Sequence, residues 1–217
     1  MPVKDNLALT SSLVAQLAEQ GGYEAMFVLD NGSIDGTAAW LAAHAREYGI
    51  VPVAAEGMCL HRMWNLGVAL ARAEQLECNV AILNNDLRIG ARFLGGLSDA
   101  LRADERLWAV CPTYDERRIE GVAHVVSTFK RRGLAGFAFM VRGEAFDRLR
   151  FEERLTWWYG DDDLVAQIYA QGRRVGIVGG VEVDHVNGGS QTLRMTPAVE
   201  AAIERDRQVM VAKWNHD

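Results

Sequence analysis

Apolar residues along the chain alternate between helical spacing and short unbroken runs. Leu9, Leu13 and Leu17 recur every four residues and predict a first helix, with Asp5 or Asn6 as its N-terminal cap. The apolar run 25–29 that follows is typical of a buried strand opening into a polar loop. Further helices are expected at about 37–48, 63–77, 91–103, 144–149, 161–171 and 197–214. Further strands are expected at about 50–53, 80–83, 107–111, 136–141, 175–178 and 181–183.

This alternation of strands and helices predicts the fold class. It favours a Rossmann-like α/β fold with a mainly parallel sheet covered by helices on both faces. The chain has 217 residues, 49% of them apolar, which is enough for a large core but not clearly enough for two independent domains. We therefore expect a single domain over 1–217.

Composition and charge narrow the class of protein. A net charge of −6 and a pI near 5.4 argue against a nucleic acid partner held through many phosphates. The three cysteines are widely spaced without a C-x-x-C pair, so they indicate neither disulfides nor a zinc site. No apolar run approaches the roughly 20 residues of a transmembrane segment, and the N-terminus has no signal pattern. The expected location is the cytoplasm.

Two polar clusters directly follow apolar runs. Asp30-Asn31-Gly32-Ser33 comes after the run 25–29, and Asn84-Asn85-Asp86 comes after the run 80–83. Each could be an ordinary turn, because Asn, Asp and Gly are favoured there for backbone reasons. Ligands of open α/β sheets bind outside the carboxyl ends of the strands, however, and both clusters belong to that edge. Together they predict a binding site.

An acidic triplet, Asp161-Asp162-Asp163, stands at the start of a predicted helix. Helix capping accounts for one or two of these carboxylates, worth roughly 0.3–1 kcal/mol each. The third needs a partner such as a metal, an arginine or a proton in transfer. Repulsion between neighbouring carboxylates raises at least one pKa, which suits a general base.

Other polar residues have two interpretations each. Asp86 could hold a magnesium or manganese ion on a diphosphate leaving group. His185 could join it as a ligand or be a structural histidine. Arg62 could reach a phosphate or lie solvated on the surface. Trp157 and Trp158 could stack on a sugar ring or fill the core.

The order and spacing of these motifs resemble the inverting family 2 glycosyltransferases with the GT-A fold, in particular the rhamnosyltransferase-like subgroup. The resemblance covers nearly the whole chain. The matching segments are Pro2-Val3-Lys4-Asp5-Asn6, Asp30-Asn31-Gly32-Ser33-Ile34-Asp35-Gly36-Thr37, Arg62-Met63-Trp64-Asn65-Leu66-Gly67, Asn84-Asn85-Asp86, Asp161-Asp162-Asp163-Leu164, and His185 with Gly188 and Ser190.

The resemblance implies roles at the matching positions. It makes Asp161 the catalytic base, with Asp162 beside it, and it gives Asp86 and His185 a divalent metal, Mn or Mg. It implies a nucleotide-binding half over 1–110 and an acceptor-binding and catalytic half over 111–217. The residues expected on the nucleotide sugar are Asp30, Asn31, Ser33, Arg62, Asn65 and Asn85.

The chain departs from the family pattern at three places. The family begins with an apolar strand before its proline, whereas only Met1 precedes Pro2, so strand one is almost wholly missing. Losing a central strand exposes the edges of its neighbours, unless an upstream start, another segment or another chain fills the gap. Asn84 and Gly160 stand where the family carries an Asp and a Glu.

These observations predict a nucleotide-sugar-dependent glycosyltransferase of the hexosyltransferase type. It would transfer a sugar from a nucleoside-diphosphate donor to an acceptor hydroxyl by single displacement with inversion. The acceptor, whether a glycan, a lipid-linked molecule or a protein, stays open, as does a homo-oligomer. Two rival interpretations are an inactive GT-A-like domain that binds a nucleotide or glycan, and a sugar nucleotidyltransferase. The latter would carry a glycine-rich basic loop after strand one, which is not found after Pro2.

Overall fold

The computed structural model describes residues 1–74, 78–114, 120–124, 133–186 and 195–214. Its elements, in chain order, are β1 (Pro2–Val3), α1 (Leu7–Gln20), β2 (Met26–Asp30), α2 (Thr37–Tyr48), β3 (Ile50–Ala54), α3 (Leu60–Ala73), β4 (Val80–Leu83), β5 (Leu87–Ile89), α4 (Phe93–Ala103), β6 (Leu107–Thr113), β7 (Val122–His124), β8 (Ala138–Val141), the 3-10 helix η1 (Gly143–Asp147), α5 (Gly160–Ala170), β9 (Arg174–His185) and α6 (Pro197–Trp214). None of the helices in these ranges combines the length and apolar character that a membrane span requires.

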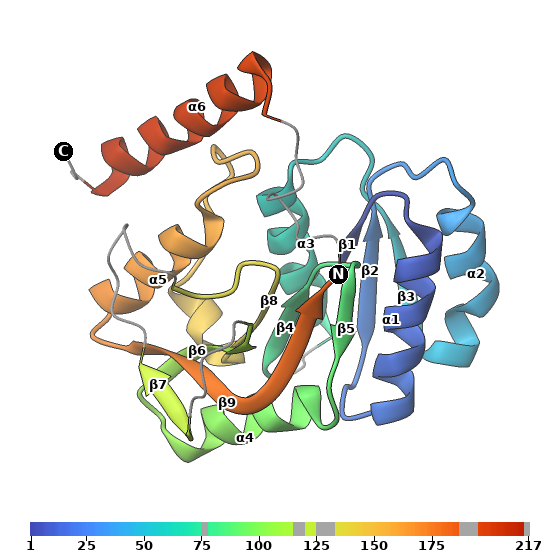
Figure 1. Ribbon diagram of the computed structural model, residues 1–217, viewed down its shortest axis with the longest axis horizontal. Helices are drawn as coiled ribbons and strands as arrows, with labels where there is room; N and C mark the ends of the chain where they lie inside the picture. Colours follow the sequence, from blue (N-terminus) through green and yellow to red (C-terminus); the bar gives the residue numbers. More distant parts are fainter. Residues whose placement is uncertain (75–77, 115–119, 125–132, 187–194, 215–217) are drawn as a thin grey trace.

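The strands form two sheets (Figure 1). The first has the order β1-β2-β3 and is parallel throughout. The second has the order β4-β8-β6-β9-β5, with β7 on β9, and only its β6–β9 pair is parallel. The Rossmann-like α/β class predicted from the sequence is confirmed, but the second sheet is more antiparallel than the pattern indicated.

The direction of the strands follows from their connections. Parallel neighbours need a crossover of a dozen or more residues, usually through a helix. A helix separates the strands of the parallel pairs: α1 lies between β1 and β2, α2 between β2 and β3, and α5 between β6 and β9. No helix separates β6 from β8 in the described residues, and that pair is antiparallel. An apolar run in the sequence does not indicate whether a strand pairs in the parallel or the antiparallel direction.

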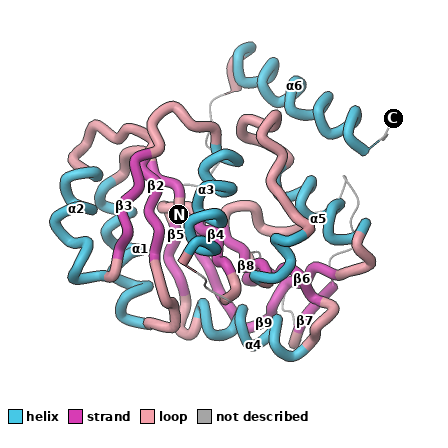
Figure 2. The backbone as a smooth tube through the Cα atoms, turned by 180° about the vertical axis from the view of Figure 1, so that it is seen from behind, coloured by secondary structure: helices cyan, strands magenta, loops and turns pink. Residues whose placement is uncertain are grey.

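Helices cover both faces of the sheets, as the sequence predicted. Neighbouring strand residues belong to opposite hydrophobic clusters, as Ile82 and Leu83 of β4 do. Leu83 packs in the cluster that includes buried residues of α1, α2 and α4, while Ile82 packs in the cluster that includes those of α3 and α5. Seen from behind, α3 lies in front of β4 (Figure 2).

Several boundaries differ from the sequence expectation. The runs 175–178 and 181–183 belong to one long strand, β9, whose pairing with β6 shifts register between Pro112 and Thr113. The strands β5 and β7 were not predicted, since three residues are too few for a periodic signal. The helix expected at 144–149 is the short 3-10 helix η1. Strand one, which the sequence analysis expected to be almost wholly missing, is present only as β1, whose two residues pair with the end of β2.

Candidate active site

The loop after β2 is fastened to the start of α1. Asp30 Oδ1 accepts hydrogen bonds from the backbone and hydroxyl of Ser33. Ser33 Oγ in turn accepts the N–H of Asp5 at 2.7 Å, and Asp5 Oδ1 accepts the N–H of Ile34 at 2.8 Å. The contacts fix the Asp30 carboxylate at the carboxyl end of β2, where the sequence predicted a ligand site.

The same loop supplies the cap of α1. Asn6 occupies the N-cap position, as the sequence predicted, but its side chain makes no capping hydrogen bond. Asp35 supplies that bond, because its Oδ2 accepts the N–H of Leu7 at 2.8 Å. Hydrogen bonds from the Thr37 hydroxyl and the Leu7 N–H hold the pKa of Asp35 below its usual range. A carboxylate 28 residues away in the sequence gives no local signal of this role.

Two asparagines expected on the nucleotide use their amides within the protein. Asn31 donates to the carbonyl of Met58 at 3.1 Å and accepts the N–H of Gly57 at 2.8 Å. Asn85 donates to Thr10 Oγ1 at 2.9 Å and to the carbonyl of Asp5 at 3.2 Å. Both side chains shape the loops at the carboxyl edge of the sheet.

Asn65 and Arg62 face the segment that precedes α5. The amide of Asn65 donates to the carbonyl of Phe151 and to Glu153 Oε1, both at 2.9 Å, and its Oδ1 accepts the N–H of Phe151 at 3.0 Å. Arg62 lies 3.8 Å from Glu153 Oε2, and 59% of its side chain is exposed. The hydrogen bonds of Asn65 thus join α3 to this segment, while the guanidinium of Arg62 is accessible to solvent.

Asp86 and His185 meet where β5 pairs with the end of β9. Leu87 faces His185 in that ladder, which brings Asp86 Oδ1 to 3.0 Å from His185 Nε2. Only 14% and 15% of the two side chains are exposed. The described residues contain no group of three His, Cys, Asp or Glu side chains placed to hold a metal. A divalent ion here would have these two ligands from the described part of the chain.

The three carboxylates of the acidic triplet lie in two different environments. Asp163 is fully buried, and Lys213 Nζ lies 2.8 Å from its Oδ1, while Trp214 Nε1 donates to the same oxygen at 2.9 Å. This lysine of α6 is the partner that the third charge required. Asp161 and Asp162 are partly buried at the start of α5, and no cation among the described residues forms an ion pair with them.

Burial is the main electrostatic influence on Asp161. It raises the pKa of this carboxyl to about 7, and the neighbouring charge of Asp162 adds to the effect. Backbone N–H groups, including that of Gly136, act in the opposite direction but do not cancel it. Burial also raises the pKa of Asp162. Asp161 therefore has the proton affinity of a general base that works near neutral pH.

The segment Gly136-Phe137 links the clusters into one site. A Cβ on Gly136 would lie 2.6 Å from Asp161 Oδ2, so only glycine allows this approach. The ring of Phe137 stacks on His185 at 4.3 Å, and its carbonyl accepts the N–H of Asn84 at 2.8 Å. Asp161, His185 and the Asn84 loop are therefore neighbours of the same two residues. The sequence interpretation placed this segment at the start of a strand and missed its role.

His61 explains the glycine at position 160. The buried imidazole donates from Nδ1 to the carbonyl of Leu155 at 2.7 Å in the tautomer that this contact requires. Burial lowers the pKa of His61, which favours the neutral ring. A Cβ on Gly160 would lie 1.9 Å from His61 Nε2, so the ring fills the space that a side chain would need.

Changing Gly160 to Ala is therefore expected to destabilise the fold by about 1–3 kcal/mol, because the methyl group overlaps a buried ring. Urea denaturation measures the change. Gly95→Ala in α4 is the matched control, since a Cβ there meets nothing within 4 Å and should be neutral or stabilising. Adding His61→Ala to Gly160→Ala should recover part of the loss. An unchanged Gly160→Ala protein would contradict this packing.

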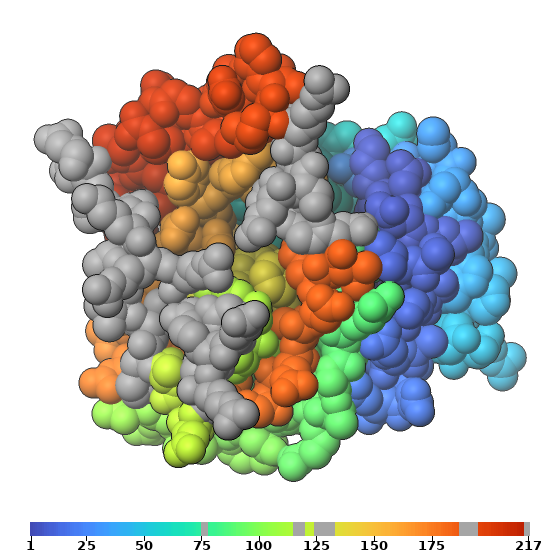
Figure 3. All heavy atoms as spheres, in the orientation of Figure 1, coloured from blue at the N-terminus to red at the C-terminus, as the bar shows by residue number. Residues whose placement is uncertain are grey.

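The C-terminal helix α6 braces the segment before α5. Asp206 is fully buried and accepts the N–H groups of Thr156, Trp157 and Trp158 at 2.9–3.0 Å. Its carboxylate also accepts the Thr156 hydroxyl. The space-filling view shows α6 in red along one edge of the molecule, against the segment that leads into α5 (Figure 3). Trp157 projects outward with 53% exposed, so it does not fill the core.

Gly188 and Ser190, which the resemblance paired with His185, lie outside the described residues. No family model matches the sequence. A search of curated proteins likewise finds no similar sequence.

Solved structures do show the same architecture. The mannosyltransferase PcManGT from Pyrobaculum calidifontis, in complex with GDP-Man and Mn2+, superposes with a TM-score of 0.73 at 19% identity, over 100% of this chain and 63% of that chain. The TarS 1–349 fragment from S. aureus with UDP-GlcNAc gives a TM-score of 0.65 at 15% identity, over 100% and 66%. GalNAc-T7 with UDP, GalNAc and Mn2+ gives 0.58 at 16% identity, over 74% and 37%.

The chain therefore spans between about a third and two thirds of the length of these proteins. Identities below 20% carry the fold and not the activity. All three are glycosyltransferases of the GT-A type. The architecture of this chain is accordingly the GT-A fold.

Proposed function

We propose that the protein is a glycosyltransferase that moves a sugar from a nucleoside-diphosphate donor to an acceptor hydroxyl with inversion. The observation that carries the proposal is Asp161, a partly buried carboxylate whose pKa is raised to about 7 and which shares the Gly136-Phe137 segment with the Asp86–His185 pair. The GT-A fold supports it, because similar structures hold GDP-Man, UDP-GlcNAc or UDP. The resemblance to family 2 assigns the same roles to the same residues.

In the proposed reaction Asp161 accepts the proton of the acceptor hydroxyl. The hydroxyl oxygen forms a bond to the anomeric carbon of the sugar from the face opposite the diphosphate. The bond between that carbon and the phosphate oxygen breaks, and its electron pair leaves with the nucleoside diphosphate. Asp162 contributes negative charge that raises the proton affinity of Asp161. Trp157, exposed just before α5, offers a ring on which an acceptor sugar can stack.

Donor binding is assigned to the half 1–110. Asp30 stands at the carboxyl end of β2 and is proposed to contact the nucleoside, in a loop that Ser33 and Asn31 hold in shape. The exposed guanidinium of Arg62 is free to reach the phosphates, since its ion pair with Glu153 is long and exposed. Asn65 and Asn85 are proposed to support this donor site through their hydrogen bonds within the protein. The half 111–217 supplies the base and the acceptor side.

Asp86 and His185 fit a divalent cation of the Mn2+ or Mg2+ type. A carboxylate and an imidazole 3.0 Å apart, held by paired strands, offer two ligands and leave positions for diphosphate oxygens. When bound, the ion neutralises charge that develops on the leaving diphosphate. PcManGT and GalNAc-T7 were solved with Mn2+.

Asp86→Asn is expected to raise the Mn2+ concentration needed for half-maximal stabilisation by a nucleoside diphosphate by about 10- to 100-fold, because a charged ligand becomes neutral. Thermal shift with UDP or GDP at increasing MnCl2 measures it. Asp184→Asn is the matched control, since Asp184 is the neighbour of His185 and its side chain is 67% exposed. Equal Mn2+ curves for the two variants would contradict the assignment of Asp86.

One experiment tests the function as a whole. The chain is incubated with UDP, GDP, UDP-GlcNAc and GDP-Man, with and without MnCl2, and both thermal stabilisation and donor hydrolysis are followed. A glycosyltransferase should be stabilised by one nucleotide class and should slowly hydrolyse the matching sugar donor. Stabilisation without turnover, even with acceptor panels, would identify a binding domain. No stabilisation by any compound would overturn the proposal.

A further inference from the structure

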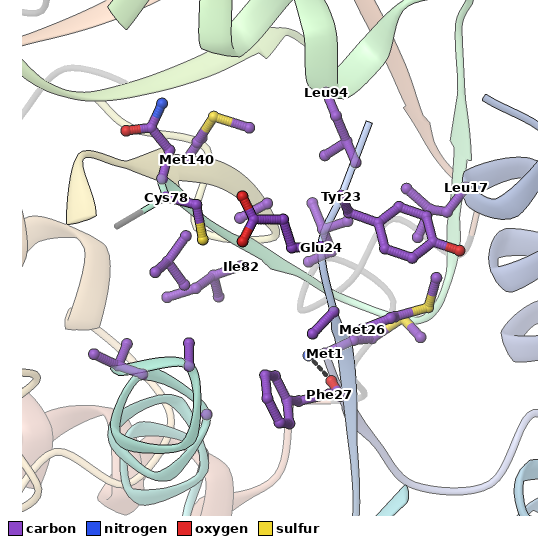
Figure 4. A pocket seen from close by; sticks show the side chains of 18 of the residues that line it. Met1, Leu17, Tyr23, Glu24, Met26, Phe27, Cys78, Ile82, Leu94 and Met140 are labelled. Carbon is purple, nitrogen blue, oxygen red and sulfur yellow. Dashed lines mark hydrogen bonds between the residues drawn. The ribbon is translucent and has the colours of Figure 1, made fainter. Parts of the chain in front are cut away.

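A cavity of about 590 Å³ lies between β2 and β4, with Tyr23, Ile82 and Met140 among its walls (Figure 4). None of the residues assigned to the reaction lines it. The cavity therefore does not hold the acceptor, which has to bind closer to the Asp161 carboxylate. The segment that leads into α5 is closer, because its last residue, Tyr159, stands two positions before Asp161.

The backbone of Tyr159 has an unfavourable conformation. It is the N-cap residue of α5, with φ of 65° and ψ of 9°, in the left-handed region that glycine adopts most easily. Its carbonyl accepts the N–H of Asp163 at 2.9 Å. Just before it, Asp206 accepts the N–H groups of Trp157 and Trp158. These contacts need only the backbone, so a glycine would make them without strain. A larger side chain kept in such a conformation indicates a function.

The phenol of Tyr159 is available as a hydrogen-bond donor. No residue in the part of the chain that the structure describes forms a hydrogen bond with it. Burial raises the pKa of Tyr159, and the negative charge of Asp162 adds to the effect, while Arg207 of α6 acts in the opposite direction. The hydroxyl is therefore protonated at neutral pH, and it lies within the electrostatic influence of the carboxylate beside Asp161.

A second exposed group on the same segment indicates the kind of acceptor. The indole of Trp157 is 53% exposed. An exposed indole offers an apolar face, and the phenol of Tyr159 offers a donor. A sugar matches both groups, because its ring presents an apolar C–H face and carries hydroxyls on neighbouring carbons. The side chain of a serine or threonine in a protein acceptor has one hydroxyl and would use only one of the two groups.

We propose that Tyr159 is an acceptor-binding residue and that the acceptor is a sugar. The phenol donates a hydrogen bond to the hydroxyl on the carbon next to the reacting one, which turns the reacting hydroxyl toward Asp161. The inference rests on the proposed function. Hydrolysis of the donor, in which water replaces the acceptor, does not use this contact. Loss of the Tyr159 hydroxyl therefore separates transfer from hydrolysis, whereas a displaced Asp161 would slow both reactions.

The test follows hydrolysis by water and transfer to a panel of methyl glycosides, with the donor that the binding screen selects. Tyr159→Phe keeps the ring and the backbone and loses only the hydroxyl. The KM for the glycoside should rise about tenfold, while hydrolysis stays within about twofold of the parent chain. Tyr169→Phe is the matched control, because it removes a hydroxyl near the other end of α5 and should leave KM unchanged.

Tyr159→Gly and Tyr159→Ala separate the backbone strain from the side chain. Both lose the phenol, but only glycine adopts a φ of 65° without strain, so the glycine variant should have a Tm about 2–4 °C above that of the alanine variant. The KM for the glycoside should nevertheless rise about 10- to 100-fold in both. Arg92→Gly is the control, since Arg92 is the left-handed N-cap of α4 with an exposed side chain, and its KM should not change.

Four results would overturn the inference and leave the proposed function standing. The first is a parent-like KM in Tyr159→Phe, and the second is an equal fall in transfer and hydrolysis, which indicates a displaced base. The third is a KM that recovers in the glycine variant relative to the alanine variant, because activity would then follow the backbone. The fourth is hydrolysis by the parent chain without transfer to any glycoside of the panel. A parent chain that neither hydrolyses nor transfers would instead contradict the proposed function, and this inference with it.

Discussion

Asp161→Asn is expected to lower kcat for glycosyl transfer by about 10²- to 10⁴-fold, because an amide of the same shape cannot accept the proton of the acceptor hydroxyl. The Asn side chain still has an oxygen that can accept the N–H of Gly136, so the local structure should persist. Thermal stabilisation by a nucleoside diphosphate should therefore match that of the parent chain. The assay is transfer or donor hydrolysis with the nucleotide sugar that the binding screen selects.

The pH dependence of the reaction tests the proposed role of Asp161 as the base. Only the deprotonated carboxylate can act, so kcat should rise with pH around the Asp161 pKa of about 7. Asp162→Asn removes the neighbouring charge, which is the second cause of the raised value. The midpoint of the profile should then move to lower pH while much of the activity remains. Full activity in Asp161→Asn, or an unshifted profile in Asp162→Asn, would contradict these roles.

Stability provides an independent check on the same carboxyl. An unfolded Asp loses its proton near pH 4, whereas folded Asp161 keeps it until about pH 7. Between these values the folded state binds more protons, so the contribution of Asp161 to stability falls as pH rises. Asp161→Asn has no such group. Its Tm relative to the parent chain should increase between pH 4 and pH 8, and a constant difference would exclude the raised pKa.

The sequence predicted most of the helices and the strand ends beside which the candidate site residues lie. Repeated leucines fix α1, and the apolar run before Asp30 places this residue at a strand end, because both signals are local. The run before Asp86 places the second cluster at the same edge in the same way. Asp86 and His185 are 99 residues apart in the chain. That they lie together was predicted only through the resemblance to a family.

Other features depend on contacts that no local pattern records. Asp206 looks like a surface charge in a helix with Glu204 and Arg207 around it, yet it is fully buried. His61 stands beside Arg62 without any sign that its ring fills the space at Gly160. Such residues can be assigned only when the distant segments are brought together. The antiparallel direction of β8 is also not recorded in any local pattern, because it follows from the path of the chain between the strands.

Asp206→Ala is the variant expected to destabilise the fold most, by about 3–5 kcal/mol. It leaves three backbone N–H groups at 156–158 without their acceptor, and a buried donor without a partner costs about 1–3 kcal/mol. The same segment holds Tyr159 in a left-handed conformation, with φ of 65°, which is unfavourable for a residue other than glycine. The carboxylate of α6 is the contact that holds these residues in place before Asp161.

Urea denaturation and Tm measure the loss, which should be near 10 °C for a chain of this size. Glu204→Gln is the matched control, because it removes one negative charge from the same helix at an exposed position and should change Tm by little. Asp206→Asn should fall between the two, since its oxygen can still accept hydrogen bonds. Asp206→Ala should also reduce transfer activity at temperatures below the unfolding transition. Asp161 directly follows the segment that loses its hydrogen bonds to α6 in this variant. Parent-like stability and activity in Asp206→Ala would show that α6 does not hold Asp161, the proposed base, in position.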